Sequence, residues 1–489
     1  MNAIDINHVS KRYGAVQALD DVSICVNQGE IFGLIGPDGA GKTTLFRIMA
    51  TLLLPDSGNA RINGYDVVRQ YKAIRQRVGY MPGKFSLYQD LTVEENLNFF
   101  ADLFGTTVKA GYDGIKAIYT QIEPFKKRKA GALSGGMKQK LALSCALIHQ
   151  PVVLFLDEPT TGVDPVSRKE LWQMLKSLKQ RNITIVAATP YIDEIRCCDR
   201  VAFLDQGKIR AIDTPDAILT QFADIFNPPG LQHVQHVTTN QAQDEDDVIK
   251  VDHLVKAFGS FHAVDDISFS VRRGEIFGFL GANGAGKTTA MHMLTGLSKP
   301  TQGTGTVAGF DIRRQSEQIK KCIGYMSQRF SLYEDMTVAQ NIKLFGGIYG
   351  MHADDISRKM DEMLRRLNFE KHRNSLVKSL PLGWKQKIAF SVSIFHEPDV
   401  VFLDEPTGGV DPATRRQFWK LIYDAAARGI TVFVTTHYMD EAEYCDRISI
   451  MVDGKIRAHG TPLELKQTYG QETMDGVFTL LAREATRGE

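Results

Sequence analysis

The chain has 489 residues, enough for two or three domains on length alone, and its 43% hydrophobic and 24% charged content is ordinary for a globular protein. Lysine and arginine number 58 against 57 aspartate and glutamate, so a net charge of +1 gives no electrostatic footprint for nucleic acid or an anionic membrane surface. No apolar run approaches the roughly 18 residues that span a bilayer. The six cysteines lack metal-type spacing and the N-terminus lacks the apolar core of a secretory signal, so we expect reduced thiols in a cytosolic protein.

The sequence repeats itself once. The stretch "GEIFGLIGPDGAGKTT" at 29–44 returns as "GEIFGFLGANGAGKTT" at 274–289, an offset of 245 residues. The offset is 247 by the later "LDEP" segments (404 against 157), so the second half is longer by a net two residues between these motifs. A repeat this long indicates a duplicated domain rather than a solenoid. We therefore expect domains at 1–225 and 248–489, joined by a polar linker at 226–247.

Each half begins with a glycine-rich loop between an apolar strand, at 31–35 or 276–280, and a helix. Glycines let backbone N–H groups converge on phosphates, and the helix N-terminus adds a favourable dipole. This context predicts a phosphate-binding P-loop, whose lysine reaches the β- and γ-phosphates and whose next threonine holds Mg²⁺. The predicted nucleotide-binding residues of the two loops are Gly36, Gly39, Gly41, Lys42, Thr43 and Thr44, and Gly281, Asn283, Gly284, Gly286, Lys287, Thr288 and Thr289.

An acidic pair follows an apolar run in each half, Asp157-Glu158 in the first and Asp404-Glu405 in the second. An aspartate at the end of a buried strand suits a Mg²⁺ ligand, commonly through water. The glutamate beside it is placed to polarise an attacking water. We therefore expect Asp157 and Asp404 at magnesium sites, and Glu158 and Glu405 in catalytic roles.

Taken in order, the P-loop, "LSGGMKQK", "LFLDEP", "GVDP" and "THYMDEAE" resemble the ATP-binding cassette (ABC) superfamily, across nearly all of both halves. The sequences of these motifs are similar to those of the tandem ATPase subunits of YbhF-type multidrug exporters, whose membrane-spanning subunits are separate polypeptides. The linker is shorter than in that type. The resemblance implies an α/β fold with two P-loop NTPase ABC nucleotide-binding domains in tandem. Each domain would have a parallel-sheet core, a small antiparallel β subdomain and a helical subdomain.

The resemblance also implies roles for residues outside the P-loops. Tyr13 and Phe258 would stack on adenine, which a flat aromatic ring can do. The signature loop would lie at the start of a helix that begins near Met137, and a D-loop aspartate of each half, Asp164 or Asp411, would lie at the interface between cassettes. The signature residues are Ser134, Gly135, Gly136 and Gln139. The implied catalytic residues are Glu405, the switch residue His437, the Q-loop residue Gln328 and Glu158, and the implied metal ligands are Thr43, Asp157, Thr288, Gln328 and Asp404.

Four positions depart from the family pattern: Gly83 in the first Q-loop, Pro190 at the first switch, and Pro381 and Leu382 in the second signature, "LPLGW". Pro381 has neither a hydroxyl nor a backbone N–H to donate, and Leu382 adds bulk where glycine allows close approach. ABC cassettes pair head to tail, with each ATP between the P-loop of one and the signature of the other. All the departures then fall on one composite site. We expect that site to hold nucleotide, and the site of the second P-loop to hydrolyse it.

Three functions fit a tandem cassette chain: an exporter ATPase, a monosaccharide-importer ATPase, and a ribosome-binding translation factor. The wording of "LSGGMKQK" and "THYMDEAEYCDR" favours export. A short acidic linker and a near-neutral chain argue against the ribosomal function. As an exporter subunit the chain would bind ATP and Mg²⁺ and lie in the cytoplasm on the inner face of the membrane. Its partners would be two separate transmembrane permease subunits and a periplasmic adaptor, with no nucleic acid.

A repeated "FSLY" follows each Q-loop, at 85–88 and 330–333. Its aromatic residues could line a groove that receives a cytoplasmic helix of the membrane partner, and ordinary packing of the helical subdomain is an equal alternative. The residues concerned are Phe85, Tyr88, Phe330 and Tyr333. The sequence does not indicate which substrate is transported, because other subunits would select it.

Overall fold

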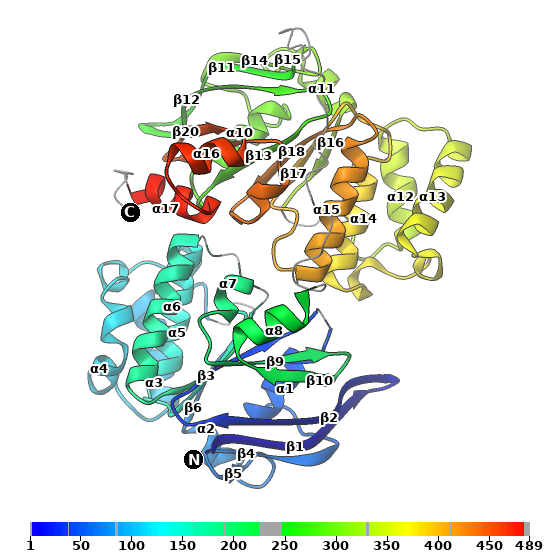
Figure 1. Cartoon of the computed structure of the whole chain (residues 1–489). Helices are drawn as coiled ribbons and strands as arrows, with labels where there is room; N and C mark the ends of the chain where they lie inside the picture. The colour runs from blue at the N-terminus through cyan, green and yellow to red at the C-terminus, as the bar shows by residue number, and fades with distance from the viewer. Residues whose placement is uncertain are drawn as a thin grey trace. The chain divides into compact units, whose positions relative to one another are not determined.

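The computed structural model describes residues 2–37, 39–83, 87–161, 163, 165–189, 191–223, 247–328, 332–410 and 412–483. The chain divides into two compact units, of which the first holds residues 1–228 and the second nearly all of 229–489 (Figure 1). Residues 226–246 of the predicted linker lie outside the described residues. So do five residues singled out in the sequence, namely Phe85, Asp164, Pro190, Phe330 and Asp411.

The first unit contains two β-sheets. The smaller is antiparallel, in the order β2-β1-β4-β5, and the larger has the order β10-β9-β3-β8-β7-β6, parallel except for β10 at its edge. Central strands β3, β7 and β8 are buried along their whole length, as expected of a parallel sheet covered on both faces. The strands are β1 (Asn2–Tyr13), β2 (Val16–Asn27), β3 (Ile31–Ile35), β4 (Ser57–Ile62), β5 (Tyr65–Asp66), β6 (Val78–Met81), β7 (Val153–Asp157), β8 (Thr184–Ala188), β9 (Arg200–Asp205) and β10 (Lys208–Asp213).

Helices of the first unit fall into two groups. Helices α3, α4 and α5 pack on one another and form the helical subdomain, whereas α1 follows the P-loop and α6 covers the large sheet. Helix α3 starts at a capping box, in which Thr92 and Glu95 bond to each other's backbone N–H groups. The helices are α1 (Lys42–Met49), α2 (Tyr71–Arg75), α3 (Val93–Leu103), α4 (Val108–Tyr119), α5 (Gly135–Leu147), α6 (Pro165–Gln180), α7 (Ile192–Ile195) and α8 (Pro215–Gln221).

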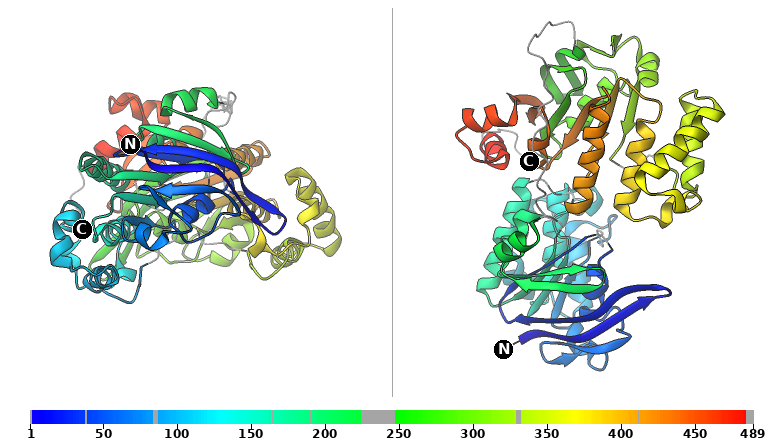
Figure 2. Two further views of the ribbon diagram at one scale, coloured as in Figure 1. Left: turned by 90° about the horizontal axis from the view of Figure 1, so that it is seen from below. Right: turned by 45° about the vertical axis from the view of Figure 1, so that its right-hand side comes forward.

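The second unit repeats this architecture. Its sheets run β12-β11-β14-β15 and β16-β17-β18-β13-β19-β20, the same order as in the first unit read from β6 to β10. In Figure 2, α12, α13 and α14 lie beside the large sheet as a separate helical group. The strands are β11 (Asp247–Phe258), β12 (Phe261–Arg272), β13 (Ile276–Gly281), β14 (Gln302–Val307), β15 (Phe310–Asp311), β16 (Ile323–Met326), β17 (Val400–Asp404), β18 (Thr431–Thr436), β19 (Arg447–Val452) and β20 (Lys455–Gly460). The helices are α10 (Lys287–Leu294), α11 (Ser316–Cys322), α12 (Val338–Ile348), α13 (Ala353–Leu367), α14 (Leu382–Ser393), α15 (Pro412–Ala426), α16 (Pro462–Thr468) and α17 (Met474–Arg483).

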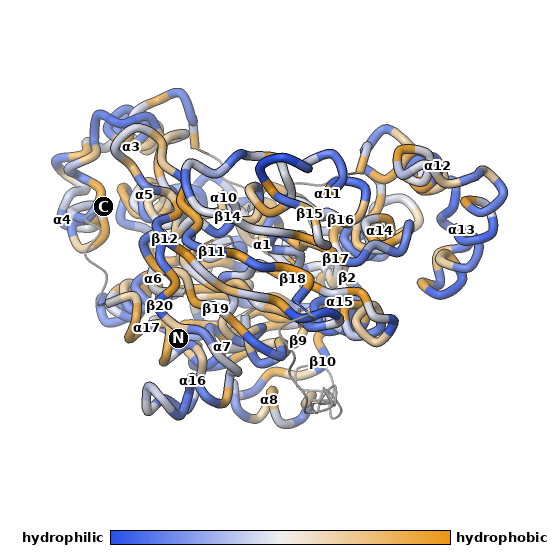
Figure 3. Tube along the Cα trace, turned by 90° about the horizontal axis from the view of Figure 1, so that it is seen from above, coloured by the Kyte–Doolittle hydropathy of each residue, from blue (hydrophilic) through white to orange (hydrophobic). Residues whose placement is uncertain are grey.

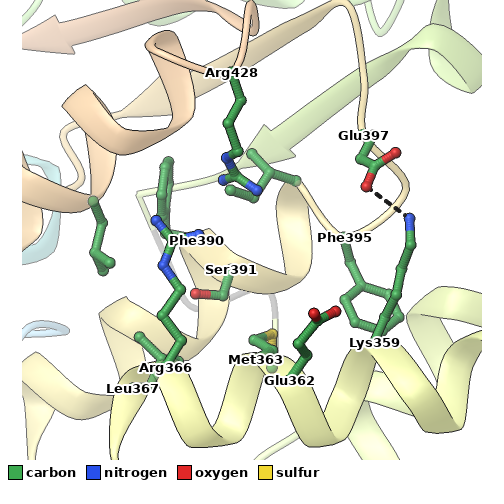
Figure 4. A pocket seen from close by; sticks show the side chains of 12 residues that line it. Lys359, Glu362, Met363, Arg366, Leu367, Phe390, Ser391, Phe395, Glu397 and Arg428 are labelled. Carbon is green, nitrogen blue, oxygen red and sulfur yellow. Dashed lines mark ion pairs between the residues drawn. The ribbon is translucent and has the colours of Figure 1, made fainter.

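The units differ in the second helix of the helical subdomain. Helix α13 has 15 residues where α4 has 12, and the connection to the following 3-10 helix, Glu370–His372 against Glu123–Phe125, is one residue shorter, which together give the net two extra residues of the second half. A cavity of about 320 Å³ lies between α13, α14 and the end of α15. Figure 4 shows Lys359 of α13 paired with Glu397 at its rim, with the nitrogen and oxygen 2.9 Å apart. Long charged side chains from exposed helix faces thus border this cavity.

Hydrophobic residues concentrate in central strands such as β18, whereas α13 is mostly hydrophilic (Figure 3). In the second unit the core under the large sheet is aromatic, and the rings of Phe277, Phe279 and Phe402 all lie within 5.5 Å of the Phe433 ring, centre to centre. Such contacts add to the stabilisation that burial provides. Within the described ranges, no helix combines the length and apolar character that crossing a bilayer requires.

Candidate functional site

The two glycine-rich loops connect the first strand of each large sheet to a helix, as the sequence predicts. Gly41 and Gly286 are the N-caps of α1 and α10, with φ values of 109° and 106°. A Cβ atom on either would lie 2.3 or 2.2 Å from the carbonyl oxygen of Ala18 or Ala263. Only glycine fits, because the position needs both a left-handed φ and close backbone approach. Each loop therefore leads directly into the N-terminus of a helix, where an anion can bind.

The P-loop lysines are buried inside their own loops. Lys42 donates from Nζ to the carbonyl oxygens of Gly36 at 2.8 Å and Pro37 at 3.1 Å. Lys287 makes the same two bonds in the second loop, at 2.7 and 3.0 Å. Each loop thus curls around an ammonium group in the geometry expected of a P-loop that neutralises phosphate charge.

Three side chains from separate segments meet at Glu405, which directly follows β17. The amide Nε2 of Gln328 donates to Oε2 of Glu405 at 2.7 Å. On the other carboxylate oxygen, Oε1, Nδ1 of His437 lies at 3.2 Å and Nζ of Lys287 at 3.7 Å. The structure therefore brings together the Q-loop, switch and P-loop residues that the sequence assigns to the second half.

These contacts determine the charge of Glu405. Burial by itself would raise the pKa of this carboxyl group, but the hydrogen bond and charge of His437, the charge of Lys287 and the amide of Gln328 together lower the pKa to about 2. Glu405 is therefore ionised at neutral pH although its side chain is mostly buried. A buried carboxylate held by a histidine and an amide can accept a hydrogen bond from water and orient it.

The aspartate of each acidic pair lies beside a P-loop threonine. In the second unit Oγ1 of Thr288 lies 3.3 Å from an oxygen of Asp404, which also accepts a 2.7 Å bond from Thr435. In the first unit Thr43 bonds Asp157, whose buried Oδ1 has no hydrogen-bond partner among the described residues. Burial raises the pKa of both aspartates, and the threonine bonds offset this in part. A hydroxyl beside a buried carboxylate fits Mg²⁺, which prefers oxygen ligands, in both units, and Asp157 in addition has a carboxylate oxygen with no hydrogen-bond partner among the described residues.

Both predicted catalytic glutamates have left-handed backbones, with φ of 53° at Glu158 and 47° at Glu405. Such values are uncommon for residues other than glycine and cluster at functional sites. The backbone N–H of each donates across to the neighbouring strand, to the carbonyl oxygen of Ala188 at 2.9 Å or Thr435 at 3.1 Å. Nothing in the sequence signals this conformation, which turns the glutamate side chain away from the path of the strand.

Within the described part of the first Q-loop, the residue beside the acidic pair is Gly83. Gly83 lies next to the acidic pair, since a Cβ atom there would be 3.1 Å from the carbonyl oxygen of Asp157 and 3.7 Å from Cβ of Glu158. The position is thus the same as that of Gln328, but it has no amide to donate. Glu158 instead accepts a 3.1 Å bond from Oγ1 of Thr161, three residues along the chain.

The two signature segments begin their helices differently. Helix α5 begins at Gly135, so the expectation that it begins near Met137 is wrong by two residues. Ser134 is the N-cap, and its side chain accepts a 3.4 Å bond from the backbone N–H of Met137. In the second unit Pro381 is the N-cap before Leu382 and makes no side-chain bond. The first signature thus keeps a hydroxyl at the helix N-terminus that the second has lost.

Packing within each unit requires the glycine that both signatures share. A Cβ atom on Gly136 would lie 2.9 Å from Oγ of Ser167, and one on Gly383 only 2.3 Å from Cγ2 of Thr414. Both neighbours belong to the first turn of the helix after the D-loop. Packing of this helix against the signature helix therefore explains why Gly383 remains in an otherwise altered signature, without reference to a ligand.

The remaining predicted residues are placed as follows. Tyr13 and Phe258 lie at the hairpin turns of the small sheets and are 44% and 59% exposed, and Nζ of Lys256 lies over the Phe258 ring, 5.3 Å from its centre. Asn283 lies in the second P-loop, and Gln139 is half-buried on α5. Thr44, Thr289, Gly39 and Gly284 also lie in the P-loop segments.

Sequence reasoning missed Thr435, which bonds both members of the second acidic pair. Its Oγ1 donates to Asp404 at 2.7 Å and accepts from the backbone N–H of Glu405 at 3.1 Å. The signal was a polar residue near the end of an apolar strand, two residues before His437. The first half has Ala188 at this place, so the difference between the sites reaches beyond the four positions first identified.

Comparison with known proteins shows the family of the chain. The family model "ABC transporter" matches residues 19–161 and 264–408. The chain is 39% identical over 542 aligned positions to "Probable multidrug ABC transporter ATP-binding protein YbhF" of Escherichia coli (strain K12), covering 95% of this chain and 94% of the relative. It is 40% identical over 219 positions to "Nod factor export ATP-binding protein I" of Burkholderia lata, covering 44% of this chain and 72% of that protein.

A solved structure described as "Structure of ATP binding subunit of ABC transporter" matches one half of the chain. It is 30% identical, covers 45% of this chain and 93% of its own, and has a TM-score of 0.42.

Proposed function

Because the chain belongs to the ABC transporter family, we propose that it is the energy-coupling subunit of an exporter, with one hydrolysing and one nucleotide-holding site. Its cassettes are ATP-binding ATPase domains, and subunits of this kind work with transmembrane components. The difference between the two proposed sites is inferred from the surroundings of Glu405 and Glu158. Gln328 and His437 hold Glu405, whereas Gly83 has no side chain to hold Glu158.

At the hydrolysing site each residue has a physical task. Lys287 neutralises charge on the phosphates, and ionised Glu405 accepts a hydrogen bond from the attacking water. Gln328 and His437 fix the carboxylate and donate toward developing charge, which is the main way that phosphoryl-transfer enzymes lower the barrier. Thr288 and Asp404 would hold Mg²⁺, which supplies additional neutralisation of the phosphates when it is bound. Head-to-tail pairing would add the hydroxyl of the first unit's signature.

The other site keeps the groups that bind nucleotide. Tyr13, Lys42 and the pair of Thr43 with Asp157 match their second-unit counterparts. It lacks the amide at Gly83, and its signature would come from the segment that begins with Pro381. Binding without these preorganised donors predicts occupancy with little turnover. We infer that ATP at this site stabilises the closed pair of cassettes.

Export rests on the relatives. Two of them carry the words "multidrug" and "export" in their names, and they match 95% and 44% of this chain. By this analogy the chain works in the cytoplasm, on the inner face of the membrane, with two permease subunits and a periplasmic adaptor. The direction of transport and the adaptor are part of the proposal.

A surface groove in the first unit fits the membrane partner. It has a volume of about 620 Å³ and lies between the large sheet and the helical subdomain, with a largely apolar lining that includes Leu52, Leu87, Phe100, Leu103 and Phe104. Tyr88 directly follows Leu87, is 51% exposed and lies edge-on to Phe99, with ring centres 4.9 Å apart. An exposed apolar groove of this kind suits an amphipathic helix, and we propose that a cytoplasmic helix of the permease docks here.

The experiment is a pull-down with the tagged Glu405→Gln chain in ATP and Mg²⁺, from a detergent-solubilised membrane extract of its own cell. Polytopic membrane proteins should co-purify, and a periplasmic adaptor among them supports export over import. The same chain with Leu103→Glu should lose the membrane proteins, while Leu463→Glu, equally exposed but outside the groove, should keep them. Ribosomal proteins without membrane subunits would overturn the proposal.

A further inference from the structure

Each unit contains a fully buried glutamate that the hydrolysis mechanism does not use. Glu441 in the second unit is 0% exposed, and Glu194 in the first is 2% exposed. Both lie four residues after the switch position, in "THYMDE" and "TPYIDE". A buried carboxylate costs several kcal/mol unless it is paired and hydrogen-bonded, so its partners must be identified.

The partners of Glu441 come from three different segments. Thr407 donates from Oγ1 to Oε1 of Glu441, and Thr436 bonds the same carboxyl group. Nε of Arg415, on α15, lies 3.5 Å from Oε1. The Arg415 guanidinium in turn lies over the ring of Tyr438, 4.5 Å from its centre. We call Glu441, Thr407, Thr436 and Arg415 together the Glu441 bracket.

Two of these partners flank the hydrolysing residues. Thr407 is two residues after Glu405, and Thr436 directly precedes His437. The Thr436 hydroxyl also accepts a 3.0 Å bond from the backbone N–H of Tyr438, so it spans the switch residue. Glu441 therefore fastens together the two short segments that present Nδ1 of His437 to Oε1 of Glu405.

The first unit contains the same bracket around a different switch residue. Glu194 accepts from Thr160 at 2.5 Å and from Thr189, and Nε of Arg168 lies 3.7 Å from it. The Arg168 guanidinium lies 4.1 Å from the centre of the Tyr191 ring. Here the residue after Thr189 is a proline, which has no side-chain donor to present. The chain thus offers the same buried network with and without a histidine to position.

We propose that Glu441 is a positioning residue for ATP hydrolysis, which acts by holding His437 against Glu405 through Thr436 and Thr407. This inference rests on the proposed role of Glu405 and His437 in the second unit. Glu441 touches neither carboxylate oxygen of Glu405, so its effect on turnover passes through the geometry of the switch. Replacing its carboxyl group with an amide should disturb these bonds and displace the switch by up to about 1 Å, which can cost up to about 100-fold in rate.

The test compares Glu441→Gln with Glu194→Gln in the purified full chain. Both replace the carboxyl group of a buried glutamate that two threonines and an arginine surround, and Glu194 has Trp172 as a further partner, so Glu194→Gln should lower the melting temperature at least as much as Glu441→Gln. Glu441→Gln should reduce kcat about 10- to 100-fold with little change in KM, whereas Glu194→Gln should keep kcat within about twofold. Equal loss of kcat in the two variants would overturn the proposal.

A double-mutant cycle separates positioning from general damage. In a His437→Ala background, adding Glu441→Gln should reduce kcat by less than about twofold, because the histidine to be positioned is absent. A full further loss would show that Glu441 acts elsewhere. If Glu441→Gln folds poorly, Thr436→Val should reproduce its loss of kcat and Thr436→Ser, which keeps the hydroxyl, should restore it. Glu405→Gln serves as the reference, since normal turnover in that variant would defeat the proposed function and not only the bracket.

Discussion

Nδ1 of His437 lies 3.2 Å from Oε1 of Glu405, and the imidazole is 1% exposed. A buried imidazole in contact with a carboxylate fixes the direction of that carboxylate. We therefore expect His437 to orient Glu405 toward the attacking water. The pair is the most direct structural reason to assign hydrolysis to the second unit.

Replacing His437 with alanine should reduce kcat for ATP hydrolysis about 100- to 1,000-fold, the cost of losing one preorganised donor. KM should change little, because Lys287 and the P-loop backbone bind the phosphates. Steady-state phosphate release measures both constants. Pro190→Ala is the matched control at the first switch, and a similar loss of kcat in that variant would argue against the assignment.

The pKa of Glu405, lowered to about 2, predicts how stability changes with pH. Because the folded pKa lies below the ordinary value, pairing of this carboxylate stabilises the second unit above about pH 4.5, and the contribution is lost as the pH falls toward 2. The difference in unfolding free energy between the wild type and Glu405→Gln should shift by about 1–3 kcal/mol over that range. Urea unfolding at several pH values tests this, and a constant difference would show that the carboxylate gains nothing from His437, Lys287 and Gln328.

Head-to-tail pairing predicts that Ser134, in the first unit, serves the site of the second. Ser134→Ala should reduce kcat about 10-fold or more, whereas Pro381→Ala should leave it unchanged. Because Ser134 also caps α5, the substitution should cost about 1 kcal/mol of stability. Thr92→Ala removes the N-cap of α3 in the same unit and controls for that loss, so an equal fall in its turnover would point to destabilisation rather than to the signature.

The aspartate beside each P-loop threonine predicts where Mg²⁺ matters. Asp404→Asn should raise the Mg²⁺ concentration needed for half-maximal hydrolysis and lower kcat, since a buried oxygen ligand loses its charge. Asp157→Asn should weaken Mg²⁺-dependent binding of a fluorescent ATP analogue with at most about a twofold change in kcat. Removal of Mg²⁺ with EDTA should stop hydrolysis in every variant. If Asp157→Asn lowered kcat more than Asp404→Asn, the two sites would have been assigned the wrong way round.

Much of the fold could be predicted because the two halves use the same local signals. The apolar runs that become β3 and β13, each followed by glycines and Lys-Thr-Thr, indicate strand, P-loop and helix without any tertiary information. The net difference of two residues also follows from the offsets, but only the structure places it in α13 and the connection that follows this helix. A helix can lengthen at its end without changing the pattern on either side.

The interior of the site could not be predicted in the same way. Glu441 reads as one more charge in "DEAE", since a charged run usually indicates a solvated face, yet it is fully buried. The left-handed backbone at Glu405 and the bond from Thr435 depend on how β17 and β18 pair. The packing of Gly383 against Thr414 likewise depends on the tertiary structure, because the two residues lie on different helices.

The central claim is that hydrolysis belongs to the second P-loop, and one pair of variants tests it most directly. Glu405→Gln and Glu158→Gln remove the same charge at the same place in the two units of the full chain. Glu405→Gln should reduce steady-state ATP hydrolysis at least about 100-fold, while Glu158→Gln should retain most of it. Near wild-type hydrolysis in Glu405→Gln, together with its loss in Glu158→Gln, would contradict the account.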